Sequence, residues 1–106
     1  MPTKLLLPLL GIMLLASAPA TAYDTLEQDF AICTQGQGSN PEIVDACTRL
    51  IDNSQVENEM VGMFYGLRAS ANDDPAQNCS DAHKVLELTT DPNLVSAGQS
   101  LVEANC

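Results

Sequence analysis

The chain has few basic residues, few aromatic residues and a single histidine. Its 106 residues include four Lys and Arg against fourteen Asp and Glu, and only four Phe and Tyr. So acidic a surface repels nucleic acid and anionic lipid, and neither is expected as a partner. The chain also lacks the Cys-x-x-Cys pair typical of a thiol redox enzyme. No segment after Ala22 alternates like a strand, which predicts an all-α fold.

The N-terminal segment 1–22 has the composition of a signal peptide. Met1–Lys4 carries one positive charge, Leu5–Leu15 is an apolar run of eleven residues, and Ala20-Thr21-Ala22 has the small-x-small pattern of a cleavage site. The apolar run is shorter than the roughly 20 residues that a membrane-spanning helix needs. We therefore expect a mature single domain, 23–106, without a membrane span, in the periplasm or secreted. All fourteen acidic residues lie in it with three basic ones, so its net charge is −11.

Prolines that follow Asn or Asp mark the starts of helices in the mature chain. Asn40-Pro41, Asp74-Pro75 and Asp91-Pro92 each combine a capping side chain with a proline suited to the first helical turn. Two glycines between positions 35 and 39 favour a turn, because glycine adopts positive φ angles cheaply. The sequence predicts a bundle of about five short helices, at Asp24–Thr34, Pro41–Asp52, Gln55–Ala71, Pro75–Leu88 and from Pro92 towards Cys106.

The helix expected at 41–52 is the clearest amphipathic one. Its apolar residues form one helical stripe: Ile43, Val44, Cys47, Leu50 and Ile51. Asp45 and Arg49 lie on the other side, at the i,i+4 spacing that favours an ion pair. In the first helix Leu26, Phe30 and Cys33 share a face. We therefore expect this face and Cys47 to point into the core.

Four cysteines in a short exported chain predict two disulfides, and three connectivities are possible in principle. If the first two helices form a hairpin, Cys33 and Cys47 lie near the same end and can pair. If the last two helices are antiparallel, Cys79 and Cys106 meet in the same way. Helical geometry thus favours Cys33–Cys47 and Cys79–Cys106. Bridges of this loop size each stabilise a chain by roughly 3 kcal/mol.

The helix expected at 55–71 carries most of the large apolar side chains: Val56, Met60, Met63, Phe64, Leu67 and Ala71. A stripe of methionine and aromatic side chains can form a binding groove, but here we interpret it mainly as the core face. Other segments offer too few large side chains to build a core without it. For a binding surface we expect an apolar groove between the third and fifth helices, with Met60, Met63, Phe64 and Tyr65 as candidate contacts.

The starts at Asn40-Pro41 and Asp74-Pro75 are separated by one period of the tetratricopeptide repeat. The stretch 46–92 resembles the degenerate tetratricopeptide-like domains of small exported bacterial proteins. The matching residues are Ala46-Cys47-Thr48, Phe64–Ala69, Ala82, Val85–Leu88 and Asp91-Pro92. Gly62 departs from the pattern, which has a large aromatic residue there. The resemblance implies a helix-pair scaffold that contacts another protein or a peptide through a groove, and it implies no chemistry.

Cys79 and His83 are the best candidates for metal ligands, because they lie four residues apart on one helical face. Two arguments oppose a metal site: a disulfide would consume Cys79, and no second pair of ligands has suitable spacing. Nucleophilic cysteine chemistry needs a free thiol and a base, and the even number of cysteines argues against a free thiol. We therefore expect no metal, no cofactor and no catalytic residues.

Two classes of function remain. The first is an exported, non-catalytic interaction module, such as an adaptor or accessory subunit in the periplasm that binds a protein partner. The second is a disulfide-bonded helical stress chaperone or a toxin-immunity protein. A chaperone should loosen in acid, where protonation of many carboxylates changes the charge balance, and should then hold many clients. An immunity or accessory protein should have one tight partner.

Overall fold

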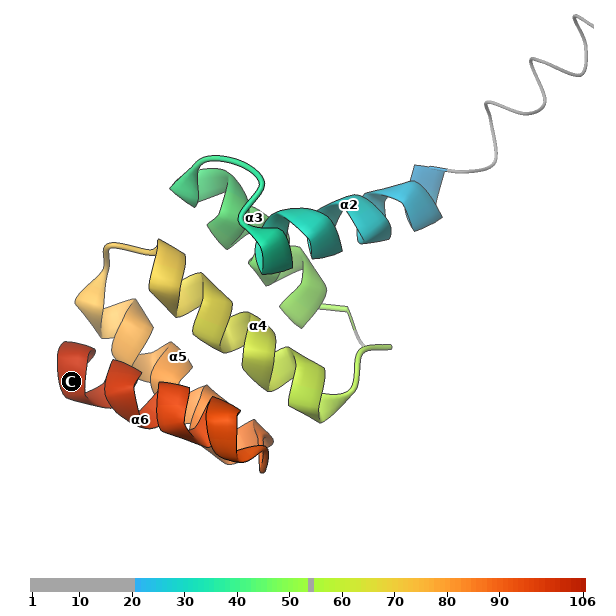
Figure 1. The fold of residues 1–106 in the computed structure, drawn as a ribbon. Helices are drawn as coiled ribbons and strands as arrows, with labels where there is room; N and C mark the ends of the chain where they lie inside the picture. Colours follow the sequence, from blue (N-terminus) through green and yellow to red (C-terminus); the bar gives the residue numbers. More distant parts are fainter. Residues whose placement is uncertain (1–20, 54) are drawn as a thin grey trace, which may run out of the picture.

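The structure is a computed structural model that describes residues 21–53 and 55–106, with side chains from Thr25 onward. This part of the chain folds into five α-helices and contains no strand: α2 (Thr21–Gln35), α3 (Asn40–Ile51), α4 (Asn58–Ala71), α5 (Pro75–Leu88) and α6 (Pro92–Asn105). Two disulfides bridge them. The prediction of a small, disulfide-stapled all-α bundle is confirmed (Figure 1).

The expected signal peptide lies almost wholly outside the described residues, and its cleavage before Tyr23 stays a prediction. Helix α2 begins at Thr21, two positions before that expected cleavage point. Among the described helices, none has the length and apolar character needed to cross a bilayer.

The α3 helix starts one residue earlier than expected, because Ser39 and not Asn40 is its cap. The Ser39 hydroxyl accepts a hydrogen bond from the Glu42 backbone N–H at 3.4 Å, and the Glu42 carboxylate accepts one from the Ser39 N–H at 3.1 Å. This reciprocal pair satisfies two backbone donors at once, which favours Ser39 over Asn40. Asp74 and Asp91 cap α5 and α6 as predicted, each accepting from two backbone N–H groups.

The α4 helix starts at Asn58, three residues later than the predicted Gln55. The Asn53 side-chain oxygen accepts a hydrogen bond from the Gln55 backbone N–H at 2.9 Å. Such a local hydrogen bond favours a turn over the start of a helix. One residue into the helix, the Glu59 carboxylate accepts hydrogen bonds from the Thr90 N–H and hydroxyl at 2.7 and 2.8 Å. The start of α4 is therefore tied to the link between α5 and α6.

Helix α4 is the central element of the fold. It contacts all four other described helices, with α2 and α3 along one side and α5 and α6 along the other (Figure 1). Gly62 allows the closest approach, because a Cβ atom at this position would lie 2.2 Å from the Thr89 Cγ2 atom at the end of α5. The large aromatic residue that the tetratricopeptide-like pattern has here would not fit.

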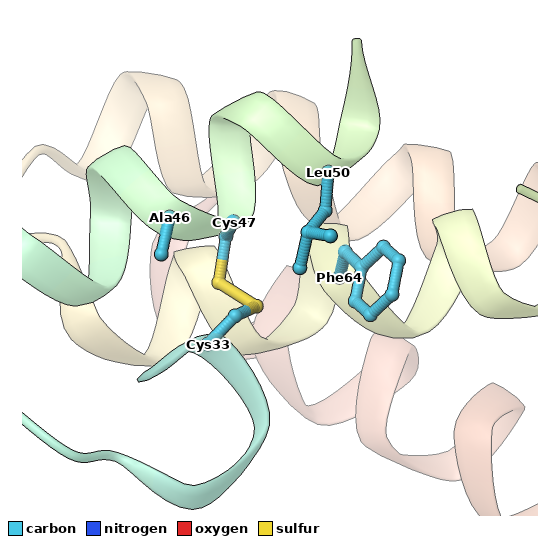
Figure 2. Close-up of a cluster of buried hydrophobic side chains, with 5 residues drawn as sticks. All are labelled: Cys33, Ala46, Cys47, Leu50 and Phe64. Atoms are coloured by element: carbon cyan, nitrogen blue, oxygen red, sulfur yellow. A yellow bond between two sulfur atoms is a disulfide. The ribbon is translucent and has the colours of Figure 1, made fainter. Parts of the chain in front are cut away.

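The hydrophobic core lies where α2, α3 and α4 meet. Figure 2 shows its five buried residues, Cys33, Ala46, Cys47, Leu50 and Phe64. The Cys33–Cys47 disulfide joins α2 to α3 inside this cluster, and Leu50 points towards the Phe64 ring. The second bridge, Cys79–Cys106, joins α5 to the end of α6. Both predicted pairings are therefore present.

The inward prediction for α2 is right for Cys33 and wrong for Leu26 and Phe30. These two side chains remain 36% and 39% exposed. The Phe30 ring touches the Phe64 ring edge-on at a centroid distance of 6.1 Å, and one side of it stays open. The cause is the position of α2 at the edge of the bundle, where no further described element covers its outer turns.

Two bidentate ion pairs join neighbouring helices. Arg49 of α3 binds Asp29 of α2 at 2.8 and 2.9 Å, and not its i,i+4 neighbour Asp45 as predicted. The Asp29 carboxylate is almost fully buried and offers two aligned oxygens, which suit the guanidinium fork. Arg68 of α4 binds Asp81 of α5 at 2.7 and 2.9 Å.

The Arg68–Asp81 pair is the centre of a larger polar network. Arg68 also donates to the Thr48 hydroxyl of α3 at 3.1 Å, and its guanidinium lies 5.2 Å from the centre of the Tyr65 ring. Gln77 donates to the same carboxylate at 3.0 Å. The hydrogen bonds to Asp81 raise the pKa of Arg68, so this charge persists at any ordinary pH. The network fixes α4 relative to both α3 and α5.

Candidate functional site

The four candidate contact residues do not share one surface. Phe64 is fully buried in the core, and Tyr65 is half-buried beside the Arg68 guanidinium. Met60 and Met63 are half-buried and border open hollows. Partner binding through these four residues therefore stays a prediction, and the buried Phe64 lies in the floor of one hollow.

The largest of the hollows found among the described residues lies between α2, α4 and the link that joins α3 to α4. It measures about 700 Å³, and we call it the α2–α4 hollow. Its lining residues are Leu26, Glu27, Phe30, Leu50, Gln55, Val56, Glu57, Met60 and Phe64. The floor is apolar, and Leu26 and Phe30 are the only large hydrophobic side chains among the described residues that remain exposed.

The shape of the α2–α4 hollow depends on how α2 is held against α3. The buried Cys33–Cys47 bridge fixes one end of α2, and the Arg49–Asp29 pair fixes the middle. Asp29 is the immediate neighbour of Phe30, so the ion pair anchors the backbone that presents this ring. Burial of Asp29 on one side of α2 and exposure of Phe30 on another give the helix a fixed rotation.

The charged residues that line the α2–α4 hollow are all acidic. Glu27 comes from α2 and Glu57 from the residue before α4, and no Lys or Arg in the described part of the chain lines the hollow. The net charge of the chain has the same sign. Carboxylates around an apolar floor attract a cationic ligand and disfavour an anionic one.

A second, smaller hollow lies between α4 and α6, where the sequence suggested a groove. It measures about 330 Å³, and we call it the α4–α6 groove. Its lining residues are Gly62, Met63, Gly66, Leu67, Ser70, Val85, Leu94, Ala97, Ser100 and Leu101. None of these described lining residues is charged, and the large apolar ones are half-buried or buried.

Cys79, His83 and Cys106 form the third feature of interest. The Cys79 and Cys106 sulfurs are bonded to each other, and the His83 imidazole lies beside them. Each residue offers one possible ligand atom, and these three atoms lie within 4.8 Å of one another. The Cys106 Sγ atom lies 3.8 Å from His83 Nε2. The sequence identified Cys79 and His83, but Cys106 joins them only because α6 runs back along α5. While the bridge is closed, neither sulfur is a thiolate that can bind a metal.

The sequence missed the contribution of α2 to the largest hollow. The signal was present as two large apolar residues one turn apart, Leu26 and Phe30, beside the acidic Glu27. Such a stripe on a helix at the edge of a bundle lies partly outside the core.

Comparison with protein-family models, with curated proteins and with solved structures finds no match to this chain.

Proposed function

We propose that the protein is an exported, non-catalytic interaction module that binds a cationic amphipathic helix of a protein partner in the α2–α4 hollow. The observation that carries this proposal is the pair of exposed side chains, Leu26 and Phe30, over an apolar floor with an acidic border. An amphipathic helix binds such a groove by inserting side chains spaced three or four residues apart. Its Lys and Arg side chains would then meet Glu27 and Glu57.

Export is supported by the signal-peptide pattern of the segment 1–22 and by the two disulfides, which persist in oxidising compartments. The resemblance to tetratricopeptide-like domains supports a scaffold that contacts a protein or peptide. The α2–α4 hollow is favoured over the α4–α6 groove because it is larger, holds the exposed hydrophobic side chains and carries the charge.

The test uses the 23–106 chain and two synthetic peptides. One is an amphipathic helix of Leu and Lys, and the other has every Lys replaced by Glu. Fluorescence anisotropy should detect binding of the Leu/Lys peptide only. The double variant Leu26→Ser/Phe30→Ser should weaken binding about tenfold or more, because a few buried anchors carry most of the energy of such interfaces. Both residues are exposed, so circular dichroism should show an unchanged fold.

The matched control is Leu94→Ser, which changes the α4–α6 groove and leaves the α2–α4 hollow intact. Loss of binding in this variant alone would move the site to the α4–α6 groove. Equal binding of both peptides would contradict the role of the acidic border. Capture of many unfolded clients from a periplasmic extract, in acid only, would replace the proposal with the chaperone alternative.

A further inference from the structure

The Cys79–Cys106 bridge differs from the other disulfide because an imidazole lies against it. Cys79 is half-buried, Cys106 is exposed, and His83 is exposed beside them. The Cys33–Cys47 bridge is buried, because Cys33 is 2% exposed and Cys47 is 0% exposed. His83 is the only histidine of the chain, so the buried bridge has no such neighbour. An exposed disulfide with a ring nitrogen beside it brings together three groups of the kind that hold zinc.

We propose that the dithiol form of this pair is a metal site, in which the Cys79 and Cys106 thiolates and a His83 ring nitrogen bind one zinc ion. Thiolate and imidazole are the ligands that Zn²⁺ takes most often, and two Cys with one His leave a fourth tetrahedral position open to water. This inference is independent of the α2–α4 hollow, so either can fail without the other.

The geometry needs only a small adjustment. Ligands at about 2.0–2.3 Å from a tetrahedral ion lie about 3.3–3.8 Å from one another. Cys106 Sγ and His83 Nε2 already lie 3.8 Å apart, and the three ligand atoms span at most 4.8 Å. Opening the S–S bond lets the two sulfurs separate by rotation of their side chains. Cys79 and His83 lie four residues apart on α5, which keeps them on one helical face.

The helices that carry these ligands are also joined by contacts other than the bridge. Gly98 lets α6 approach α5 closely, since a Cβ atom there would lie 3.0 Å from Val85 and Leu86 side-chain atoms. The Asn78 amide donates to the Asn72 carbonyl at 2.7 Å and approaches the Asn105 side chain at 3.4 Å. The Gly98 contact packs the middle of α6 on α5, and the Asn78–Asn105 contact places the end of α6 beside the first turn of α5. The site is therefore largely formed before a metal arrives.

The chemistry balances without a hidden reactant. A dithiol reductant gives two electrons and two protons to the Cys79–Cys106 bond, which opens to two thiols while the reductant closes its own disulfide. Zn²⁺ then replaces the two thiol protons, which leave to solvent. A newly made chain carries these cysteines as thiols and reaches the same state without a reductant. Zinc and oxidant thus compete for one pair of sulfurs, whereas the buried Cys33–Cys47 pair takes no part.

The experiment titrates the 23–106 chain with Zn²⁺ alone, and with Co²⁺ as a coloured substitute, in oxidised form and after mild phosphine reduction. Alkylation and mass spectrometry establish which bridge has opened. The reduced chain should bind one ion per chain with a sulfur-to-cobalt absorption band, and the oxidised chain should not. His83→Gln should weaken zinc binding by roughly 10–100-fold or more, since mutation of even an outer-shell partner of a metal ligand lowers metal affinity by about this factor.

Two controls complete the design. The oxidised chain reports any binding by the acidic surface, and Glu87→Gln, one turn beyond His83, should leave zinc affinity unchanged. Circular dichroism recorded in the same titration separates loss of the site from loss of the fold. If reduction unfolds the chain, zinc should restore the helices, because binding free energy then becomes folding free energy. Absence of binding and of refolding, or equal affinity in the His83→Gln variant, would overturn the proposal.

Discussion

The two disulfides join the two helix pairs that pack on α4, and they do so in different surroundings. Cys33–Cys47 lies inside the core and touches Leu50 and Phe64 through the same buried cluster. Cys79–Cys106 lies at the surface, where it joins two helices that already pack against each other. The first bridge is therefore part of the interior, and the second is partly exposed to solvent. The difference shows that two bridges of the same chemistry can have different surroundings in one small fold, one inside the core and one at the surface.

Removal of each bridge in turn gives the largest expected effect. In the chain-entropy model the disulfide that closes the longer loop stabilises the fold more. The expected stabilisation is about 3 kcal/mol for Cys33–Cys47 and about 3.5 kcal/mol for Cys79–Cys106. Packing reverses this order, because truncation of buried side chains adds about 1–2 kcal/mol of cavity cost. We expect Cys33→Ala/Cys47→Ala to lose about 4–5 kcal/mol in urea unfolding, more than Cys79→Ala/Cys106→Ala. A larger loss from the second pair would mean that α6 depends on its bridge.

The two ion pairs repeat the contrast between interior and surface. Arg68 is 14% exposed over a carboxylate that is 1% exposed, whereas the Arg49 side chain is 54% exposed. Arg68→Met leaves Asp81 as a buried unpaired charge and should destabilise the fold by about 3 kcal/mol or more. Arg49→Met lets water reach Asp29 and should cost about 1 kcal/mol. Thermal unfolding of the two matched variants checks this order, and equal losses would contradict it.

The close contact between α4 and the end of α5 depends on the absence of a side chain at Gly62. A Cβ atom at Gly62 would lie 2.2 Å from Thr89, and a Cβ atom at Gly66 would lie 3.4 Å from Val85, an ordinary contact. Gly62→Ala should therefore destabilise the fold by about 1–3 kcal/mol through overpacking. Gly66→Ala, one turn later, should be neutral or stabilise it by up to about 1 kcal/mol, since alanine is the better helix former. If both variants gain stability, the α4–α5 contact is looser than described.

The number of helices, two of their starts and the disulfide pairing were predictable, because each depends on local signals. Asp74-Pro75 and Asp91-Pro92 mark starts that the structure keeps, and helical spacing brings each cysteine to the right face. Arg49 shows where this reasoning ends. The local i,i+4 spacing predicts Asp45 as its partner. The structure pairs it instead with Asp29, a buried carboxylate much earlier in the chain that offers two aligned oxygens. Such a partner depends on the crossing of two helices, which periodicity does not specify.

The candidate site was predicted less well for the same reason. A stripe of apolar residues identifies the inner face of a helix, but it does not say how much of that face the neighbours cover. Leu26 and Phe30 extend past the end of the core, and their exposure follows from the edge position of α2. The cluster of Cys79, His83 and Cys106, by contrast, follows from the predicted pairing, because His83 lies one turn from Cys79 and Cys106 meets Cys79 where α6 is antiparallel to α5.

The smallest effect concerns the cap that starts α3 near the buried bridge. Hydrogen bonds from the Ser39 backbone and hydroxyl lower the pKa of Glu42 below its usual value of 4.5. A carboxyl with a lowered pKa stabilises the fold above its unfolded pKa, and this contribution disappears as the pH falls through the folded pKa. The stability difference between the wild type and Glu42→Gln should therefore shrink below about pH 4.5, as measured by urea unfolding at several pH values.

Glutamine keeps the reciprocal cap but carries no charge, so the comparison isolates ionisation from hydrogen bonding. Other carboxylates titrate alike in both proteins and cancel in the difference. Ser39→Ala supplies the second arm of a double-mutant cycle, because it removes the hydroxyl donor and should reduce the pH-dependent part. A difference between wild type and Glu42→Gln that stays constant from neutral pH into acid would mean that the α3 cap acts through geometry alone. The acid response of the protein would then have to arise elsewhere in its carboxylates.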